Sequence, residues 1–385
     1  MESSVFSLTG FLSSQTRIRD VAVGMGFESD CASHTILTGA MMHPLGIQFL
    51  SFRPTAPKII LIISGTHGVE GPAGYDLQMD LLEKRVHEKL PADTGLVFVV
   101  ALNPWGWANG RRTDGNNVDL NRNGLTVGAP SDTPPYTSEI TALVHPKQCD
   151  EEWYRALSEQ LADPVQCASL RAQVFRGQDA DPKGIFYGGH ERAWSLQQLD
   201  NFCVENLLNT CQHLAVLDIH TGLGEFGEIM LISSARPSDD KLIARVKSWF
   251  GLTPVFPKLG QTDRVNAVSS NLLFYIAQCL PRVQVTGLAV EIGTIPFEES
   301  FPIFVVENWL YHQPPAKFEA TLADVFRPQA QKEVQRRFCQ AFYPPIKDKE
   351  SGQEWSAAAR AGFDPIFRTV VRGLAEGCDH VKASP

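Results

Sequence analysis

The chain has 385 residues, of which 43% are hydrophobic and 20% are charged. This composition excludes disordered and fibrous proteins and predicts a folded protein of enzyme size. A net charge of −9, from 34 Lys and Arg against 43 Asp and Glu, argues against binding to nucleic acid through its phosphates. The longest apolar run near the start, 59–63, is far shorter than the roughly 18 residues of a membrane span, so we expect no membrane partner.

The first residues contain no Lys or Arg before Arg17 and no long apolar stretch, so they do not resemble a secretory signal. We therefore expect a cytoplasmic protein. The eight Cys are scattered without a CxxC pair, which predicts reduced thiols rather than a disulfide framework or a thiolate metal site. No long Gly/Ser or charged linker divides the chain, and a single domain over 1–385 is expected.

Four short apolar runs, which are followed by SGTHGVEG, NPWGWANGRR, HTGLG and EIGT, predict strands that are buried on both faces of a sheet. In chain order they are 58–63, 96–102, 214–219 and 287–290. Helix-like segments lie between them, such as 72–83, where Pro72 suits a first helical turn. Alternation of strand and helix predicts an α/β sheet, whose ligands bind at the carboxyl ends of the strands.

Two regions depart from this alternation. Six prolines break up the helical pattern of 124–189, which includes a helical segment at 151–161, and we interpret this region as an insertion beside the site. From residue 314 onward, two charged helical segments flank Pro344 and Pro345, and they predict a C-terminal extension packed on the core.

The first candidate site follows the strand at 58–63. His67 and Glu70 form an HxxE pattern inside SGTHGVEG, where glycines permit a tight turn and a close approach to a ligand. Imidazole nitrogen and carboxylate oxygen both suit zinc, although a surface His beside a solvated Glu gives the same pattern. An HExxH helix is absent, which excludes a thermolysin-like arrangement.

A catalytic zinc usually takes three protein ligands and leaves one position for water. His220, in LAVLDIHTGLG, stands at the end of another strand and is the candidate third ligand, the alternative being a histidine buried in the core. Glu291, in GLAVEIGT, also leaves an apolar strand and is the candidate general base; a buried Glu paired with an Arg is the alternative interpretation.

The loop NPWGWANGRRTDGNNVDLNRN, after the strand at 96–102, contains four groups that bind anions. Arg side chains match a carboxylate with two parallel hydrogen bonds, and an Arg also stabilises charge that develops on a carbonyl oxygen. These groups are Arg111, Arg112, Asn121 and Arg122.

The residues occur in the order HxxE, Arg, Asn-Arg, strand-end His and strand-end Glu, which resembles the zinc carboxypeptidase family over about 58–300. The segments SGTHGVEG, RRTDGNNVDLNRN and LDIHTGLG are most similar to the branch called domain of unknown function 2817. The resemblance implies a three-layer α/β/α fold with a mixed, mostly parallel sheet of the phosphorylase/hydrolase type.

The resemblance also implies roles for individual residues. His67, Glu70 and His220 would bind one zinc ion, and Glu291 would be the general acid and base. Asp119 would orient the first ligand His.

In the anion-binding loop, the same resemblance implies that Asn121 and Arg122 bind a substrate carboxylate. Either Arg111 or Arg112 would polarise the scissile carbonyl. The sequence departs from the family at one point: the carboxypeptidases have a mobile Tyr before the catalytic Glu, and only Tyr275 lies near that position here.

The sequence thus predicts zinc-dependent hydrolysis of an amide bond in a small peptide or acylated amino acid with a free carboxylate. The main alternative is an N-acyl amino acid deacylase similar to the aspartoacylases and succinylglutamate desuccinylases. A binding module without catalysis is the third possibility. Whether Glu225 or Glu228 contributes stays open at this point.

Overall fold

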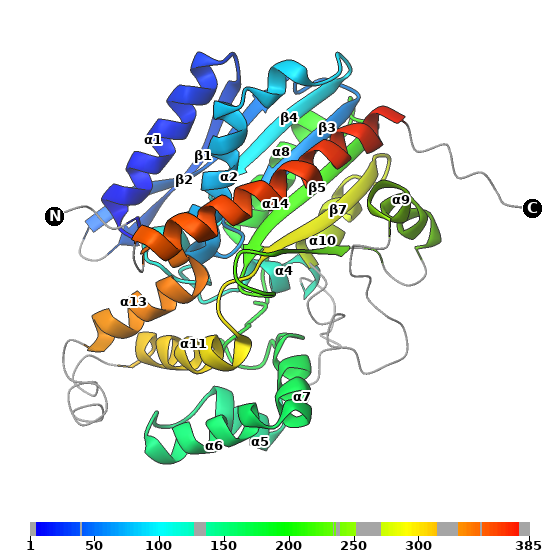
Figure 1. The fold of residues 1–385 in the computed structure, drawn as a ribbon. Coiled ribbons are helices and arrows are strands. Elements are labelled where there is room, and N and C mark those ends of the chain that lie inside the picture. The colour runs from blue at the N-terminus through cyan, green and yellow to red at the C-terminus, as the bar shows by residue number, and fades with distance from the viewer. Residues whose placement is uncertain are drawn as a thin grey trace, which may run out of the picture.

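The computed structural model describes residues 5–38, 41–126, 136–233, 235, 239–251, 271–313, 330–346 and 349–376. Its centre is a seven-stranded sheet in the order β1-β2-β4-β3-β5-β7-β6 (Figure 1). Strands β4, β3, β5 and β7 are parallel to one another, whereas β1, β2 and β6 run antiparallel to their neighbours. The strands are β1 (Glu28–Thr38), β2 (Met41–Phe52), β3 (Lys58–Ile63), β4 (Thr94–Val100), β5 (His213–Thr221), β6 (Ile229–Ser233) and β7 (Gln284–Ile292). The predicted α/β class with a mixed sheet is confirmed, with parallel pairing confined to the four central strands.

The central strands are apolar because both of their faces are covered. Every residue of β4 is buried, and so are the last five of β3, which explains their continuous apolar runs. Strand β3 has the predicted bounds, while β4 begins and ends two residues earlier than predicted. Strands β5 and β7 extend beyond their predicted ends. His220 and Glu291 therefore lie within the strands, next to their last residues, rather than after the strands.

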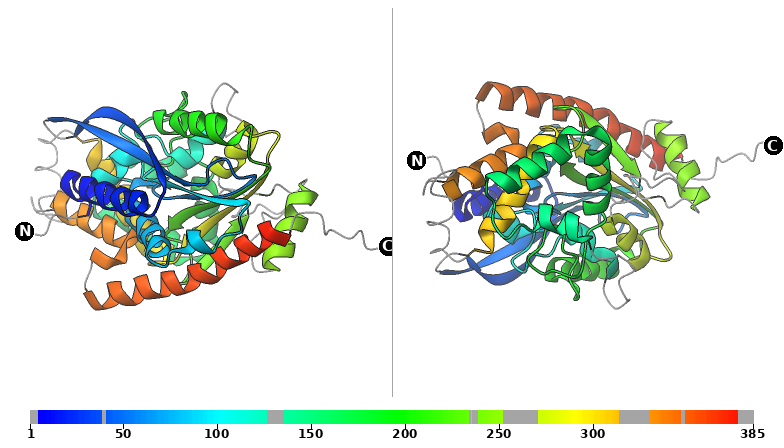
Figure 2. Two further views of the ribbon diagram at one scale, coloured as in Figure 1. Left: turned by 90° about the horizontal axis from the view of Figure 1, so that it is seen from above. Right: turned by 90° about the horizontal axis from the view of Figure 1, so that it is seen from below.

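Helices pack on both faces of the sheet, as the views along it show (Figure 2). One face carries α1 (Leu8–Gly24), α2 (Gly71–Glu83), α9 (Asp240–Phe250) and α14 (Lys349–Glu376). The other face carries α8 (Trp194–Phe202), its continuation as a π-helix (Cys203–Leu207), and α10 (Asn271–Cys279). This is the predicted α/β/α layering, and α2 begins one residue before the predicted helix, with Pro72 in its first turn.

A further group of helices lies beyond the carboxyl ends of the parallel strands (Figure 1). It shares one apolar cluster, to which residues far apart in the sequence contribute. The helices are α5 (Ser138–Val144), α6 (Glu151–Ala162), α7 (Pro164–Val174), α11 (Phe297–Tyr311) and α13 (Ala330–Phe342). The expected insertion thus contributes α5 to α7, while 127–135 within it lies outside the described residues.

The expected C-terminal extension contributes α13 and α14, which lie on either side of a 3₁₀ helix at Pro344–Ile346. Its segments 314–329, 347–348 and 377–385 lie outside the described residues. Short helices connect the remaining elements: the 3₁₀ helices Gly68–Glu70 and Val86–Lys89, with α3 (Pro104–Ala108) and α4 (Leu120–Thr126).

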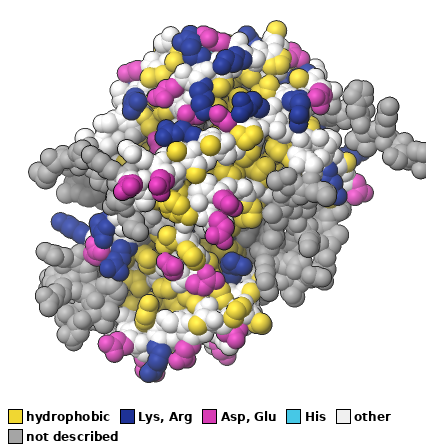
Figure 3. All heavy atoms as spheres, viewed as in Figure 1, with side chains coloured by type: hydrophobic (Ala, Val, Ile, Leu, Met, Phe, Trp, Pro, Cys, Tyr) yellow, Lys and Arg dark blue, Asp and Glu magenta, His cyan; other side chains and the backbone are white. Residues whose placement is uncertain are grey.

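On the face shown in Figure 3, Lys and Arg side chains are interspersed with Asp and Glu side chains. Such mixing produces no extended field of one sign on that face. None of the described helices combines the length and the apolar character that crossing a bilayer requires. The seven cysteines within the described residues are free thiols, as expected.

Candidate active site

The turn after β3 brings His67 and Glu70 to the carboxyl edge of the sheet. Gly65 has a φ of +72°, a conformation that glycine adopts without strain. A Cβ atom on Gly68 would lie 2.1 Å from the carbonyl carbon of Gly106, so only glycine permits this approach to α3. The turn is also held by hydrogen bonds from the Gly68 and Val69 amides to the carbonyls of Arg112 and Arg111.

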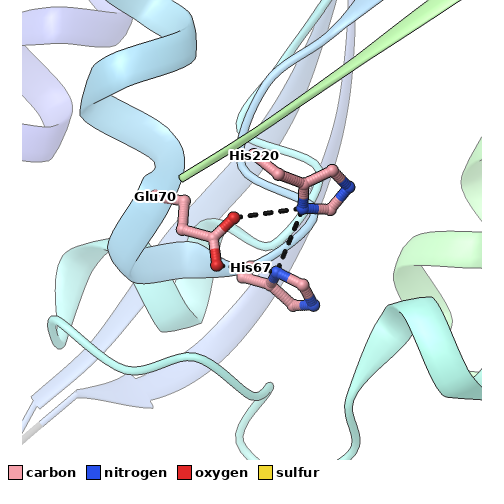
Figure 4. A group of neighbouring side chains, drawn as sticks. All are labelled: His67, Glu70 and His220. Atoms are coloured by element: carbon pink, nitrogen blue, oxygen red, sulfur yellow. Dashed lines mark hydrogen bonds and ion pairs between the residues drawn. The ribbon is translucent and has the colours of Figure 1, made fainter. Parts of the chain in front are cut away.

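His67, Glu70 and His220 converge on one point (Figure 4). The Nδ1 atoms of the two histidines lie 3.2 Å apart, and they lie 2.9 Å and 3.1 Å from the two carboxylate oxygens of Glu70. One candidate ligand atom from each residue lies within 4.8 Å of the others, and all three side chains are buried. The structure therefore brings together the three residues that the sequence predicts as metal ligands.

Each of these histidines contacts a buried carboxylate through its other ring nitrogen. Nε2 of His67 lies 3.2 Å from Oδ1 of Asp119, and Nε2 of His220 lies 2.7 Å from Oδ2 of Asp218. The second oxygen of Asp218 accepts a hydrogen bond from the Thr66 hydroxyl at 2.7 Å. Carboxylates in these positions fix the ring orientation and leave both Nδ1 atoms directed at Glu70.

Asp218 is the residue that the sequence reasoning missed. Side chains two residues apart in a strand point to the same side of the sheet, so a candidate ligand at His220 places Asp218 beside it. The segment LDIH, with Asp two residues before His, therefore predicts a carboxylate beside the candidate ligand.

The charges of the cluster are mutually stabilising. Burial alone would raise the pKa of Glu70, but the charge of His67 and the hydrogen bond from His220 hold it well below its ordinary value. Burial also opposes the ionisation of Asp119, and Arg112 and His67 outweigh it and lower that pKa. Burial would lower the pKa of His220, whereas Asp218 and Glu70 raise it well above its ordinary range.

Glu291 lines the same cavity and lacks a partner for one oxygen. Its Oε2 atom is buried without a hydrogen bond to any described residue. Burial raises its pKa to about 7, with a further contribution from the negative charge of Glu70, while His220 acts in the opposite direction. The predicted alternative, a Glu held by an Arg ion pair, has no counterpart among the described contacts of Glu291.

The adjacent arginines point in different directions. Arg112 lines the cavity, donates from Nε to Asp119 at 3.0 Å and contacts Glu70 at 3.3 Å. Arg111 instead forms a buried ion pair with Glu307 at 3.0 Å, and its guanidinium carbon lies 3.7 Å from the centre of the Tyr311 ring. The structure thus places only Arg112 of this pair at the cavity.

Asn121 and Arg122 also line the cavity. The Asn121 side chain accepts a hydrogen bond from the Leu272 amide of α10 at 3.3 Å. Nε and Nη1 of Arg122 are buried without hydrogen-bond partners among the described residues. Buried donors without partners are costly, so this guanidinium is suited to pairing with an anion.

Three other candidates lie away from the described cavity lining. Tyr275 donates a hydrogen bond to Asp200 and packs under the Arg192 guanidinium, 4.0 Å from its carbon. Glu225 and Glu228 are exposed in the loop before β6. None of the three is among the residues that line the cavity.

Most of the remaining cavity wall is aromatic and was not predicted. Besides Thr221, Gly222, Leu223 and Ser300, it contains six phenylalanines, here called the phenylalanine wall: Phe175, Phe186, Phe297, Phe301, Phe304 and Phe342. They come from the insertion, α11 and α13, and a sequence pattern does not reveal that segments so far apart meet.

The ligand set fits a zinc ion. Two imidazole nitrogens and a carboxylate are the donors of catalytic zinc sites, and a carboxylate behind each imidazole is the usual support. Both conditions hold at His67, Glu70 and His220.

Comparisons with known proteins place the chain in a family. The family described as "Protein of unknown function (DUF2817)" matches residues 10–350. No curated protein matches.

Several solved structures are similar at low identity. A metallo-carboxypeptidase from Burkholderia cenocepacia is 15% identical, with 72% of this chain and 60% of that chain covered and a TM-score of 0.38. A succinylglutamate desuccinylase from Silicibacter sp. TM1040 is 10% identical, with coverages of 74% and 66% and a TM-score of 0.37. A metallo-carboxypeptidase from Pseudomonas aeruginosa, in complex with (2-guanidinoethylmercapto)succinic acid, is 13% identical, with coverages of 91% and 68% and a TM-score of 0.38.

The chain spans 60% to 68% of the length of these three proteins. The family match, in contrast, extends over most of the chain and agrees with the resemblance seen in its motifs. The chain belongs to the DUF2817 family.

Proposed function

We propose that the protein is a zinc-dependent hydrolase that cleaves an amide bond in a small peptide or N-acyl amino acid with a free carboxylate. One observation carries this proposal: a single cavity is lined by His67 and Glu70 of the His67–Glu70–His220 cluster, by Glu291 and by Arg122. Among the described residues, Oε2 of Glu291 and both Nε and Nη1 of Arg122 have no hydrogen-bond partner. A ligand set, a base and an anion site are the parts that this reaction requires.

His67, Glu70 and His220 would hold the ion. Zinc in such a site lowers the pKa of water toward about 7 and polarises a carbonyl group. Asp119 and Asp218 hold the ring proton of each imidazole at Nε2 and orient the ring by accepting hydrogen bonds there, which would leave Nδ1 to bind the ion.

Glu291 takes the proton of the attacking water and delivers it to the leaving amine. A general base works best when its pKa lies near the working pH, and burial raises the pKa of Glu291 to about 7. Because one of its oxygens has no partner among the described residues, it is available to accept that proton.

Arg122 binds the substrate carboxylate, with Asn121 beside it. Arg112 donates hydrogen bonds to the scissile carbonyl oxygen, where negative charge develops. Arg111 takes no part, since its guanidinium is committed to Glu307 and Tyr311.

The test combines metal content with turnover. Purified protein should contain one zinc ion, and His67→Ala and His220→Ala should lose it, whereas the exposed His190→Ala should retain it. The zinc-loaded protein should release amine from a panel of dipeptides and N-acyl amino acids, and removal of zinc by a chelator should abolish the release. Full activity in metal-free protein would exclude this function.

A further inference from the structure

A second cavity lies close to the candidate active site in the sequence but shares none of its lining residues. Its volume of about 470 Å³ is in the range of ligand sites. Arg112 lines the first cavity, whereas Asp114, Gly115 and Asn116 line the second. A molecule in the second cavity would therefore contact residues that the proposed hydrolysis does not use.

Four rings form the aromatic part of this cavity, and they come from β1, α3, α8 and α11: His34, Trp105, Trp194 and Tyr311. The ring centres of His34 and Trp194 lie 5.5 Å apart. Those of Trp105 and Tyr311 lie 6.0 Å apart in an edge-on arrangement. Rings held in pairs offer apolar surface to the C–H groups of a ligand at little cost in side-chain entropy.

Gly115 leaves space beside the indole of Trp105. A Cβ atom on Gly115 would lie 3.5 Å from two carbon atoms of that ring and 3.6 Å from its nitrogen. These are ordinary van der Waals distances, so a methyl group would fit there without a clash. It would occupy the place beside the indole that a ligand takes when residue 115 is glycine.

Polar groups without protein partners also line the cavity. Oδ1 of Asp114 accepts hydrogen bonds from the Asn116 and Val118 amides at 2.9 Å and 2.8 Å, and its Oδ2 has no hydrogen-bond partner among the described residues. The same holds for the side-chain amide of Asn116 and for the hydroxyl of Ser195, a residue that is only 5% exposed. Together they offer donors and acceptors in one place, which suits ligand hydroxyl groups because a hydroxyl both donates and accepts.

The charges around the cavity disfavour an ionic ligand. Burial raises the pKa of Asp114 to about 6, so its carboxylate is mostly ionised at neutral pH and would repel an anion. The described residues that line the cavity include no Lys or Arg to offset it. A cation would meet a second obstacle, since the Arg111 guanidinium already packs 3.7 Å from the centre of the Tyr311 ring. A neutral molecule with C–H faces and several hydroxyl groups fits best, and a sugar ring has both.

We propose that this cavity is a binding site for a neutral saccharide. The sugar ring packs its C–H face against the indoles of Trp105 and Trp194, and its hydroxyl groups pair with Asp114, Asn116 and Ser195. The site is separate from the metal cluster, and the inference does not depend on the proposed function.

The first experiment titrates the zinc-loaded full-length protein with glucose, galactose, N-acetylglucosamine, cellobiose, lactose and chitobiose, using calorimetry and tryptophan fluorescence. We expect at least one of them to bind with a Kd of about 1 mM or lower. Glucuronic acid, a sugar ring with a carboxylate, and choline, a small cation, are the matched charged probes and should bind more weakly. Absence of binding by all six saccharides at up to about 10 mM, or tighter binding of either charged probe, would overturn the proposal.

The second experiment locates the bound saccharide with two variants. Gly115→Ala should weaken binding by at least about 3-fold by filling the space beside the indole. Asp114→Asn keeps the oxygen that accepts the two amides but replaces the free one, and should weaken binding by about 10-fold. Gly24→Ala, in α1 where a Cβ would meet nothing within 4 Å, is the matched control and should bind as the unaltered protein does.

Zinc content and thermal stability of the variants report whether the fold is intact, and both should be retained in Gly115→Ala. A saccharide that binds Gly115→Ala and Asp114→Asn as tightly as the unaltered protein would lie elsewhere, and the proposed site would be wrong.

Discussion

His220 on β5 and Glu291 on β7 are directly paired residues of adjacent parallel strands. Paired residues in a sheet point to the same side, so this register directs the third candidate ligand and the candidate base to the same side of the sheet. A shift of one residue in the pairing would turn either side chain to the opposite face. The relative placement of these two candidate residues is thus built into the pairing of two apolar strands.

Glu291→Gln removes the proton acceptor and keeps the shape of the side chain. We expect zinc content to be unchanged and kcat to fall by about 10²-fold or more. Glu225→Gln, in an exposed position, should retain full activity. Loss of zinc in Glu291→Gln would instead identify Glu291 as a ligand.

Asp218→Asn weakens the support of His220 without altering a ligand. We expect zinc affinity to fall by about 10- to 100-fold, as measured by competition with a chelating dye. Asp119→Asn should have an effect of the same size through His67. Asp200→Asn, whose carboxylate contacts Tyr275 instead, serves as the control, and an unchanged zinc affinity in Asp218→Asn would show that the contact with His220 has no supporting role.

Arg122→Ala should lower kcat/KM for substrates that have a free carboxylate. Loss of a charge-assisted hydrogen bond of about 1.5 to 3 kcal/mol predicts a decrease in kcat/KM of roughly 10- to 150-fold for the free acid and little change for the matching C-terminal amide. Arg112→Ala should depress turnover of both, because it acts on the scissile carbonyl. Equal losses on acid and amide in Arg122→Ala would contradict the carboxylate role.

Arg111 should affect stability rather than chemistry. Arg111→Met leaves the Glu307 carboxylate buried without its partner, which we expect to lower the free energy of unfolding by about 3 to 5 kcal/mol in denaturant titrations. The double variant Arg111→Met/Glu307→Leu should recover most of that loss. No recovery would mean that the Tyr311 and Asn117 contacts of Arg111, rather than the ion pair, carry the stability.

Asp76 should make stability depend on pH. Burial raises its pKa to about 6, in spite of a hydrogen bond from Tyr343, against about 3.9 in an unfolded chain. The folded state therefore binds a proton more tightly, and this group's contribution falls as pH rises from about 4 to 6, by up to about 1.4 kcal/mol per pH unit. Asp76→Asn should remove this contribution to the pH dependence of the free energy of unfolding. The measurement is the free energy of unfolding of both proteins at several pH values across this range. An identical pH dependence in the two proteins would assign it to other groups.

Sequence reasoning succeeded where a local pattern records burial. Strands β3, β5 and β7 are buried on both faces and were recognisable as apolar runs. Strand β1 was not recognisable in this way, because it lies at the edge of the sheet and many of its residues are polar. Its structure depends on pairing with β2.

The same limit applies to the site. The neighbours Arg111 and Arg112 look equivalent in the sequence, and only contacts with α11 and Asp119 direct them to different places. The phenylalanine wall depends on meetings between Phe186, Phe304 and Phe342, which no spacing along the chain records.

The contribution of Phe342 to the cavity has a consequence for protein synthesis. Its carbonyl accepts a hydrogen bond from Thr221, the residue after His220, and its ring belongs to the phenylalanine wall. The ribosome releases the segments that carry both histidines and both glutamates before it releases α13. The wall of the cavity is therefore complete only after α13, one of the last helices to be synthesised, has packed beside the strand that carries His220.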